Sequence, residues 1–284
     1  MPEENTEMRS KPLFHLSACT IIAALAAVTA AVQPLPAQTP ASLNQAGVGM
    51  GHLHVLVSES DYDAHRNAWI EGLGARPEKL GPLEVLLLPG VTIVIKKGES
   101  AGGSEGSTVN HLGFLVQDLK ARVKHWEGLG LKVDERRPSP IQAFLRFPGN
   151  IKVELSEDPT ITTPVAHHHI HLYTTEVDAM KKWYVEKFGG APGKRGRFEE
   201  AWFPGVRISI APADDKPAGT KGRAVDHIGF EIEGLEAFCK KLEAQGVKFN
   251  IPYKTVDAIK SSIAFLTDPW GTYIELTEGF DALR

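Results

Sequence analysis

The sequence contains little cysteine: two residues, Cys19 and Cys239, in a chain of 284. Cys19 lies in an N-terminal segment that we expect to be removed. Cys239 lies in a predicted helix whose apolar residues recur at helical spacing. The mature chain is therefore expected to form no disulfide. A metal site built from histidine and carboxylate side chains suits such a chain better than one built from thiolates, which oxidise outside the cytoplasm.

Neither sign of charge dominates. The chain has 31 basic and 35 acidic residues, and its formal net charge is −4. This balance gives no electrostatic footprint for nucleic acid and no basic face for a membrane. The expected partner is a small-molecule substrate, and a homodimer is left open. With 42% hydrophobic residues, the chain can bury a sizeable core in one large or two medium domains.

The most apolar segment, residues 17–32, is shorter than the roughly 20 residues that a membrane span needs. Arg9 and Lys11 precede it, and Pro34-Leu-Pro-Ala37 follows it, which is the pattern of a secretory signal. We therefore predict a signal peptide over residues 1–37 and a secreted or periplasmic protein with no membrane attachment after cleavage. A retained membrane anchor is the alternative.

Histidine heads four similar segments of alternating apolar residues: His52, His111, His169 and His227. Their separations are 111 − 52 = 59, 169 − 111 = 58 and 227 − 169 = 58 residues. A segment with helical spacing follows each one, and a Pro-centred turn then leads into a final strand. Each unit is therefore predicted to be a strand, a helix and two or three further strands.

Polar connectors at 98–107 and 212–222, together with residues 157–164, divide the chain. We predict an α+β fold of four βαβββ units, paired into two concave, funnel-like mixed sheets with helices outside. We expect an N-terminal domain at 51–156 and a C-terminal domain at 165–280, each with two units. We expect linkers at 38–50 and 157–164.

Two glutamates lie in apolar final strands, Glu154 and Glu275, where an ionised carboxylate is costly unless a positive group pairs with it. Units one and three have no such glutamate: they end in Val94-Ile95 and Ser209-Ile210. Each half of the chain is therefore expected to supply two histidines and one glutamate. The expected metal ligands are His169, His227 and Glu275 in the C-terminal half, and His52 (or His54), His111 and Glu154 in the N-terminal half.

Two imidazoles and one carboxylate are the facial arrangement of non-haem Fe(II) sites, so Fe(II) or Mn(II) is the favoured ion, and the donors also suit Zn, Ni or Co. Three protein ligands leave coordination positions open, as in catalytic sites. The simpler interpretation is that four equivalent histidines only reflect duplication of one unit. His171 and Tyr273 lie two residues from predicted ligands, and we expect them to be catalytic proton donors or acceptors.

Three basic residues, Arg146, Lys152 and Arg207, are expected either to receive an anionic substrate or to form a solvated rim.

Specific motifs carry a family resemblance: His227-Ile-Gly-Phe230, the spacing from His169 to Trp183-Tyr184, and Phe265-Leu-Thr-Asp-Pro-Trp-Gly-Thr-Tyr-Ile-Glu275-Leu. With these motifs the chain resembles the vicinal oxygen chelate superfamily, which includes glyoxalases, bleomycin-resistance proteins and extradiol dioxygenases. The resemblance implies a funnel of paired βαβββ units and a divalent metal held by first-strand and last-strand residues.

The resemblance implies a metal-dependent dioxygenase, lyase or isomerase whose small oxygenated substrate is chelated by the metal. The alternative is a metal-free binding protein of the bleomycin-resistance type. Two departures weaken specific activities. Ile263 and Phe265 stand on the strand where extradiol enzymes would offer a tyrosine, and the odd-numbered units lack the glutamate of a glyoxalase I site.

Overall fold

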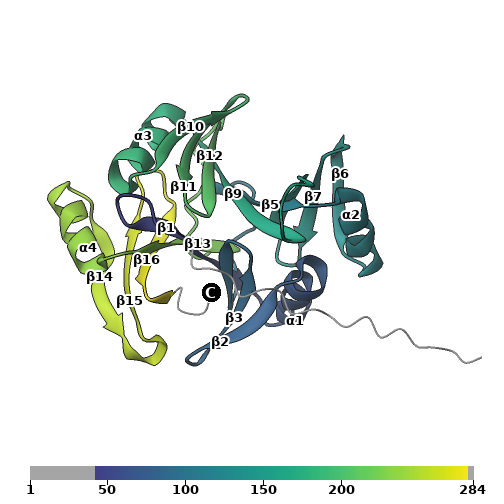
Figure 1. Cartoon of the computed structure of the whole chain (residues 1–284), viewed down its shortest axis with the longest axis horizontal. Helices are drawn as coiled ribbons and strands as arrows, with labels where there is room; N and C mark the ends of the chain where they lie inside the picture. Colours follow the sequence, from purple (N-terminus) through teal and green to yellow (C-terminus); the bar gives the residue numbers. More distant parts are fainter. Residues whose placement is uncertain (1–41, 281–284) are drawn as a thin grey trace, which may run out of the picture. The chain divides into compact units, whose positions relative to one another are not determined.

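Four βαβββ units make up the computed structural model, which describes residues 42–280 apart from the side chains of residues 135–138 (Figure 1). The predicted signal peptide at 1–37 lies outside the described residues. The first unit contains β1 (Val48–Val57), α1 (Tyr62–Asn67), the π-helical turn η1 (Ala68–Gly72), β2 (Arg76–Leu80), β3 (Leu83–Leu88) and β4 (Val91–Lys97). The second contains β5 (Val109–Val116), α2 (Leu119–Gly128), β6 (Lys132–Ser139), β7 (Gln142–Phe147) and β8 (Ile151–Glu157).

The other two units repeat this order. The third contains β9 (Val165–Thr174), α3 (Val177–Phe188), β10 (Ala191–Arg195), β11 (Phe198–Phe203) and β12 (Val206–Pro212). The fourth contains β13 (Val225–Ile232), α4 (Leu235–Ala244), β14 (Phe249–Val256), the 3-10 turn η2 (Asp257–Ile259), β15 (Ser261–Thr267) and β16 (Tyr273–Glu278). None of the helices within residues 42–280 is long and apolar enough to cross a membrane.

The units pair into two eight-stranded mixed sheets, so the predicted fold class is confirmed. The partners differ from those expected. One sheet has the order β14-β15-β16-β13-β1-β4-β3-β2 and joins units one and four; the other has the order β10-β11-β12-β9-β5-β8-β7-β6 and joins units two and three. The expectation that each half, 51–156 or 165–280, pairs its own two units is therefore wrong. The strand β1 also begins at Val48, inside the predicted 38–50 linker.

The connectors explain why this pairing is available. Because all four first strands carry the same apolar pattern, either pairing would bury them equally well. The two connectors that looked like independent polar loops are hydrogen-bonded to each other: Ala101 N–H donates to Gly222 O at 2.9 Å, and Thr108 N–H donates to Ala218 O at 2.9 Å. Their backbone groups are thus satisfied where the chain passes from one sheet to the other and back.

Strand alternation explains which side chains reach each face of a sheet. In β13, Ile228 and Phe230 are fully buried in the main core, and the Phe230 ring packs against Phe188 of α3 with centroids 5.2 Å apart. Residues two apart in a strand point the same way, so His227 and Gly229 lie on the opposite face. The histidine face of each sheet is therefore the one free to build a site.

Candidate functional site

Two clusters of histidine and glutamate side chains, buried except for half-buried His54, lie on the histidine faces, one in each sheet. The four donor atoms of each cluster lie within 4.8 Å of one another. Cluster A consists of His52, His54, His227 and Glu275, and cluster B consists of His111, Glu154, His169 and His171.

The six predicted metal ligands are all in these clusters, but in different combinations from those expected. His227 and Glu275 lie together, with His52 as their partner in place of His169. His169 lies instead with His111 and Glu154. The grouping by halves is wrong because each sheet takes one unit from each half. Whether these side chains bind metal remains a prediction.

Strand pairing brings the four donors of each cluster together. In cluster A, β1 lies antiparallel to β13 with His54 opposite His227, and β13 lies parallel to β16 with Gly229 opposite Glu275. Cluster B repeats this arrangement: His111 lies opposite His171 across β5 and β9, and Gly113 lies opposite Glu154 across β5 and β8. Adjacent strands are about 4.8 Å apart, so the side chains of these residues converge.

In cluster A, the Glu275 carboxylate is at the centre. Its Oε2 lies 2.9 Å from His52 Nε2 and 2.8 Å from His227 Nε2. The Nδ1 atom of His54 lies 3.1 Å from His227 Nε2. On its other side, His227 Nδ1–H donates to the Asp226 carboxylate at 2.6 Å, which fixes the ring with Nε2 toward the cluster.

Cluster B has the same atoms in the same roles. His111 Nε2 lies 3.0 Å from Glu154 Oε2, and His171 Nδ1 lies 3.2 Å from His111 Nε2. His169 Nε2 is 3.6 Å from Glu154 Oε2, and it has no hydrogen-bond partner in the described part of the chain. His111 Nδ1–H donates to the Asn110 side-chain oxygen at 2.9 Å, so an amide stands where cluster A has Asp226.

Two glycines make room for the imidazoles that come from the odd-numbered units. A Cβ atom on Gly229 would lie 2.2 Å from His52 Cε1, and one on Gly113 would lie 2.0 Å from His169 Cε1. Real Cβ atoms do not approach other atoms so closely, so any side chain at these positions would displace the rings. The glycine two residues after each even-unit histidine is therefore part of the site.

Burial sets the charge of the clusters. It lowers the pKa of His111 to about 4 and that of His171 to about 2, so both rings are neutral near pH 7. Burial alone would also raise the pKa of Glu154, but its hydrogen bond with His111 and charge interactions with the His111 and His169 rings hold it well below the usual range. Cluster B therefore combines an ionised Glu154 carboxylate with the neutral rings of His111 and His171.

This protonation pattern points to a cation. When His111 is neutral and gives its one proton to Asn110, its Nε2 lone pair faces the Glu154 carboxylate at 3.0 Å. In that tautomer the two acceptors would repel each other unless a proton or a metal ion lay between them. In cluster A, burial opposes a charge on His227, but hydrogen bonds to Asp226 and Glu275 raise its pKa above the usual value. Both clusters therefore favour positive charge at their centres.

The donor spacing fits a shared divalent ion. Neighbouring octahedral ligands about 2.1 Å from a metal lie roughly 3.0 Å apart. The donor contacts are 2.8, 2.9 and 3.1 Å in cluster A and 3.0, 3.2 and 3.6 Å in cluster B. An ion would also give the His169 Nε2 atom a partner. The residues present fit a metal such as Fe(II), Mn(II), Zn, Ni or Co.

The sequence did not predict the third histidine of each cluster as a ligand. The sequence predicts His54 only as a substitute for His52, and His171 only as a catalytic residue. Both rings point Nδ1 at the neighbouring histidine. The signal was present in the sequence: a His-x-His pair occurs in both units that lack a final-strand glutamate, at 52–54 and 169–171.

Register shows what the third histidine accompanies. In β4, Val94 lies beside His54, and in β12, Ser209 lies beside His171. Val94 and Ser209 occupy the positions that Glu275 and Glu154 hold in the even-numbered units. In all four units this position lies beside the first-strand residue that comes two after the first histidine. The odd-numbered units thus lack the carboxylate and carry an extra imidazole.

The two predicted catalytic residues lie at different clusters. His171 belongs to cluster B, whereas Tyr273 lies beside cluster A, where its ring stacks on Phe265 with centroids 5.1 Å apart and meets the His227 ring at 5.7 Å. Burial raises the pKa of Tyr273, and nearby Asp226 and Glu275 raise it further, so the phenol keeps its proton.

The predicted basic residues are largely engaged with other side chains. Arg146 pairs with Asp134 at 2.8 Å and with Glu105, and Lys152 pairs with Glu105 at 3.0 Å. The Arg207 guanidinium lies over the Trp202 ring, 5.3 Å from its centroid. Arg146 and Lys152 are thus engaged in ion pairs, whereas Arg207 is stacked on an aromatic ring.

A cavity of about 420 Å³ opens onto cluster A. The four cluster residues line it, and the rest of its wall is mainly apolar with a few polar side chains. The other lining residues are Leu83, Val94, Lys96, Lys221, Asp226, Ile251, Ile259, Phe265, Tyr273 and Phe280.

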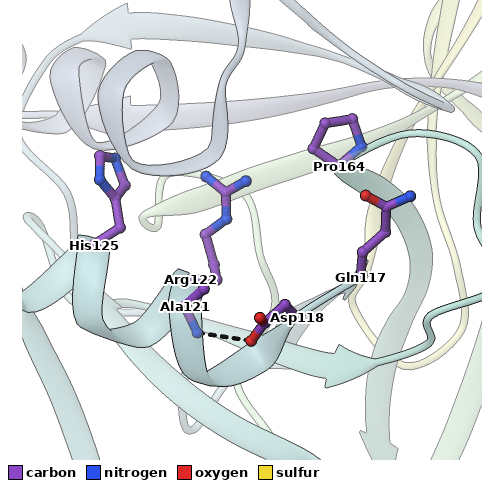
Figure 2. Close-up of a pocket in the computed structure, with 6 residues that line it drawn as sticks. All are labelled: Gln117, Asp118, Ala121, Arg122, His125 and Pro164. Atoms are coloured by element: carbon purple, nitrogen blue, oxygen red, sulfur yellow. Dashed lines mark hydrogen bonds between the residues drawn. The ribbon is translucent and has the colours of Figure 1, made fainter.

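A separate pocket beside α2, of about 350 Å³, contains no cluster residue (Figure 2). Its two basic side chains anchor the helix: Arg122 donates to Gly72 O at 3.0 Å, and His125 Nε2–H donates to Glu71 O at 2.7 Å. We therefore assign that pocket a role in packing.

Comparison with known proteins agrees with this architecture. Residues 166–276 match the family model described as the Glyoxalase/Bleomycin resistance protein/Dioxygenase superfamily. Glyoxalase I of Saccharomyces cerevisiae is 28% identical over 46% of this chain and 48% of its own length, so the chain spans about half of that curated relative.

Two solved structures share the fold. Glyoxalase I from Zea mays superposes with a TM-score of 0.66 at 15% identity, over 83% of this chain and 94% of that one. A putative dioxygenase from Bacillus subtilis superposes with a TM-score of 0.61 at 15% identity, over 82% and 86% of the two chains.

Proposed function

We propose that this chain is a metal-dependent enzyme of the Glyoxalase/Bleomycin resistance protein/Dioxygenase superfamily that acts at cluster A; the match of residues 166–276 to that family model, which agrees with the sequence motifs, supports the proposal. Its substrate is a small molecule with neighbouring oxygen atoms, held in the cavity that opens onto the cluster.

One observation carries the proposal: buried imidazole nitrogens and a carboxylate oxygen converge at distances of 2.8 to 3.1 Å in cluster A, with a cavity beside them. Three histidines and one glutamate replace the two histidines and one glutamate expected from the sequence. The four donors would hold a divalent ion and would leave it open positions for substrate oxygens. A bound divalent metal supplies Lewis acidity, which polarises those oxygens and acidifies the neighbouring C–H bond.

The side chains around the cavity carry the rest of the chemistry. Asp226 holds the His227 ring in one orientation, and it also accepts the Gly222 N–H at 2.6 Å, so its position is fixed. Tyr273, as a protonated phenol lining the cavity, is placed to donate a hydrogen bond or a proton to a substrate oxygen. Ile251 and Phe265 line the same cavity with apolar surface.

These roles favour proton transfer over oxygen insertion. The cavity-lining residues of β14 and β15 are Ile251 and Phe265, neither of which can act as an acid or base. We therefore infer an isomerase or lyase reaction rather than ring cleavage.

The test is an activity screen of the full chain after metal removal and reloading, separately with Mn(II), Fe(II), Co(II), Ni(II) and Zn(II). We expect glyoxalase I-type or lyase-type turnover that depends on the metal, without consumption of oxygen in an oxygen-electrode assay. A Glu275→Gln variant should lose the turnover, whereas Glu154→Gln should retain it.

Oxygen uptake with a catechol would instead favour a dioxygenase. Tight binding of an unchanged small molecule by metal-free protein would favour the sequestering alternative. We also keep export as a proposal, which N-terminal sequencing of the mature protein from cells tests directly.

A further inference from the structure

We propose that the cavity at cluster A selects an anionic substrate: one with chelating oxygens at one end, an apolar body, and a carboxylate at the other end that meets Lys96 and Lys221. This inference deepens the proposed function and rests on it. It comes from a position-by-position comparison of the surroundings of clusters A and B, which share one set of donors.

The strand registers define which positions are equivalent in the two sheets. Val85 lies opposite Val94 across β3 and β4, and Glu200 lies opposite Ser209 across β11 and β12. Val94 and Ser209 lie beside the third histidines of clusters A and B. Residues at the same distance from these positions along the paired strands are therefore equivalent in the two sheets.

The wall of unit one is apolar where the wall of unit three is polar. The wall of unit one is formed by β2, β3 and β4, whose buried residues pack with Phe280 into a small hydrophobic cluster. These residues are Leu80, Val85, Leu87 and Val94. The equivalent positions around cluster B are Arg195, Glu200, Trp202 and Ser209.

The polar side chains of the wall at cluster B form hydrogen bonds with one another. The buried Glu200 carboxylate accepts from Ser209 Oγ at 2.6 Å, from Trp202 Nε1 at 2.6 Å and from Arg195 Nε at 3.1 Å. Cluster A offers a hydrocarbon surface in the same place, and its Phe280 ring lies 4.7 Å from the His52 ring. An apolar substrate body therefore fits cluster A and not cluster B.

The loops before β5 and β13 reverse the charge at the mouths of the two sites. Each loop holds the last strand of its unit by the same bond: Ser104 Oγ accepts the Lys152 N–H at 3.0 Å, and Thr220 Oγ1 accepts the Tyr273 N–H at 2.9 Å. The next residue is Glu105 in the first loop and Lys221 in the second.

These two residues make different contacts. Glu105 neutralises Lys152 and Arg146 beside cluster B. Lys221 instead lies over the Tyr273 ring, 4.8 Å from its centroid, and it lines the cavity at cluster A.

A second lysine, Lys96, lines the same cavity. It follows Val94 by two residues in β4, so it lies on the same face and farther from the cluster, and Ala211 is the equivalent residue in β12. Among the residues that the structure describes, neither Lys96 nor Lys221 forms an ion pair. The nearby Asp226 carboxylate is already bonded to His227 and Gly222. Two exposed cations thus line a cavity whose wall is otherwise mainly apolar away from the cluster, Asp226 and Tyr273, and they would pair with a carboxylate on the substrate.

The test compares two metal-chelating probes of matched shape. Benzohydroxamate carries two neighbouring oxygens on an aromatic ring, and 4-carboxybenzohydroxamate adds a carboxylate at the far end. Both are titrated by calorimetry into Co(II)-loaded Glu154→Gln protein, in which cluster B lacks its carboxylate and cluster A is read alone. The absorption spectrum of the Co(II) ion reports chelation.

We expect the carboxylated probe to bind about fivefold to tenfold more tightly, because two ion pairs at a solvent-exposed rim contribute modestly. The double variant Lys96→Met/Lys221→Met should lose this preference and keep its affinity for benzohydroxamate. Higher salt should weaken only the carboxylated probe. The matched control, Lys182→Met/Lys240→Met, removes two exposed lysines from α3 and α4 and should retain the preference.

Equal affinity for the two probes, or a preference that survives in the Lys96→Met/Lys221→Met variant, would overturn the inference. Failure of the proposed function would look different: neither probe would change the Co(II) spectrum.

Discussion

Asp226→Asn should weaken metal binding at cluster A by about 10-fold to 100-fold, the usual cost of losing the partner that orients a histidine ligand. The Asp226 carboxylate accepts the His227 Nδ1–H at 2.6 Å, and its side chain is only 22% exposed. A charged acceptor makes a hydrogen bond about twice as strong as a neutral one and makes the opposite ring nitrogen a better donor to a cation. The expected loss corresponds to about 1.4 to 2.7 kcal/mol.

Cluster B provides the reciprocal experiment, because Asn110 already occupies the position of Asp226 and lies 2.9 Å from His111. Asn110→Asp should tighten metal binding there by a similar factor. Each affinity is measured by competition between Zn(II) and a chromophoric chelator. The Glu154→Gln background reports on cluster A, and the Glu275→Gln background reports on cluster B.

Circular dichroism melting serves as the control, since Asp226 also accepts the Gly222 N–H and its replacement has a structural cost. If Asp226→Asn leaves the Zn(II) affinity within twofold of the parent while Asn110→Asp has no effect, the assigned role of these two side chains is refuted.

Two further predictions concern glycine and a histidine outside the clusters. Gly229→Ala should displace His52, since its Cβ would lie 2.2 Å from that ring. We expect elemental analysis to find that the ion of cluster A is lost and the ion of cluster B is retained. The control variant Gly128→Ala, with no atom within 4 Å of its Cβ, should retain both ions. Buried His65 donates to Pro148 O at 2.9 Å and accepts from Trp69, and burial lowers its pKa to about 4. Since the folded pKa lies below the unfolded value of about 6.5, the free energy of unfolding falls as pH drops from about 6.5 toward 4. Chemical denaturation at pH 7 and pH 5 should therefore show a loss of stability on acidification that is about 2 kcal/mol smaller in His65→Gln than in the parent. An identical pH dependence in the two proteins would contradict the assignment.

The sequence predicted the units and their chemistry because both are local properties. The alternation around His227 places Ile228 and Phe230 in the core, and the apolar strand around Glu275 identifies its carboxylate as one that needs a positive partner. These features depend on a few neighbouring residues, and the structure brings all six proposed ligands into the two clusters.

Unit pairing could not be predicted in the same way. The first strands of all four units carry nearly the same pattern, so the sequence cannot distinguish pairing within halves from pairing across them. The contacts that accompany the observed pairing include backbone hydrogen bonds between connectors 98–107 and 212–222, such as Ala101 to Gly222, which leave no signature in residue type. The wrong pairing then misplaced His169 beside Glu275 and hid the role of His54.

The central claim is that each set of three histidines and one glutamate holds one divalent cation. It is tested most directly by equilibrium dialysis of the full chain against Zn(II) or Mn(II), followed by elemental analysis. We predict two ions per chain in the parent, one in Glu275→Gln, one in Glu154→Gln and none in the double variant. A metal content that is the same in all four proteins would contradict the account.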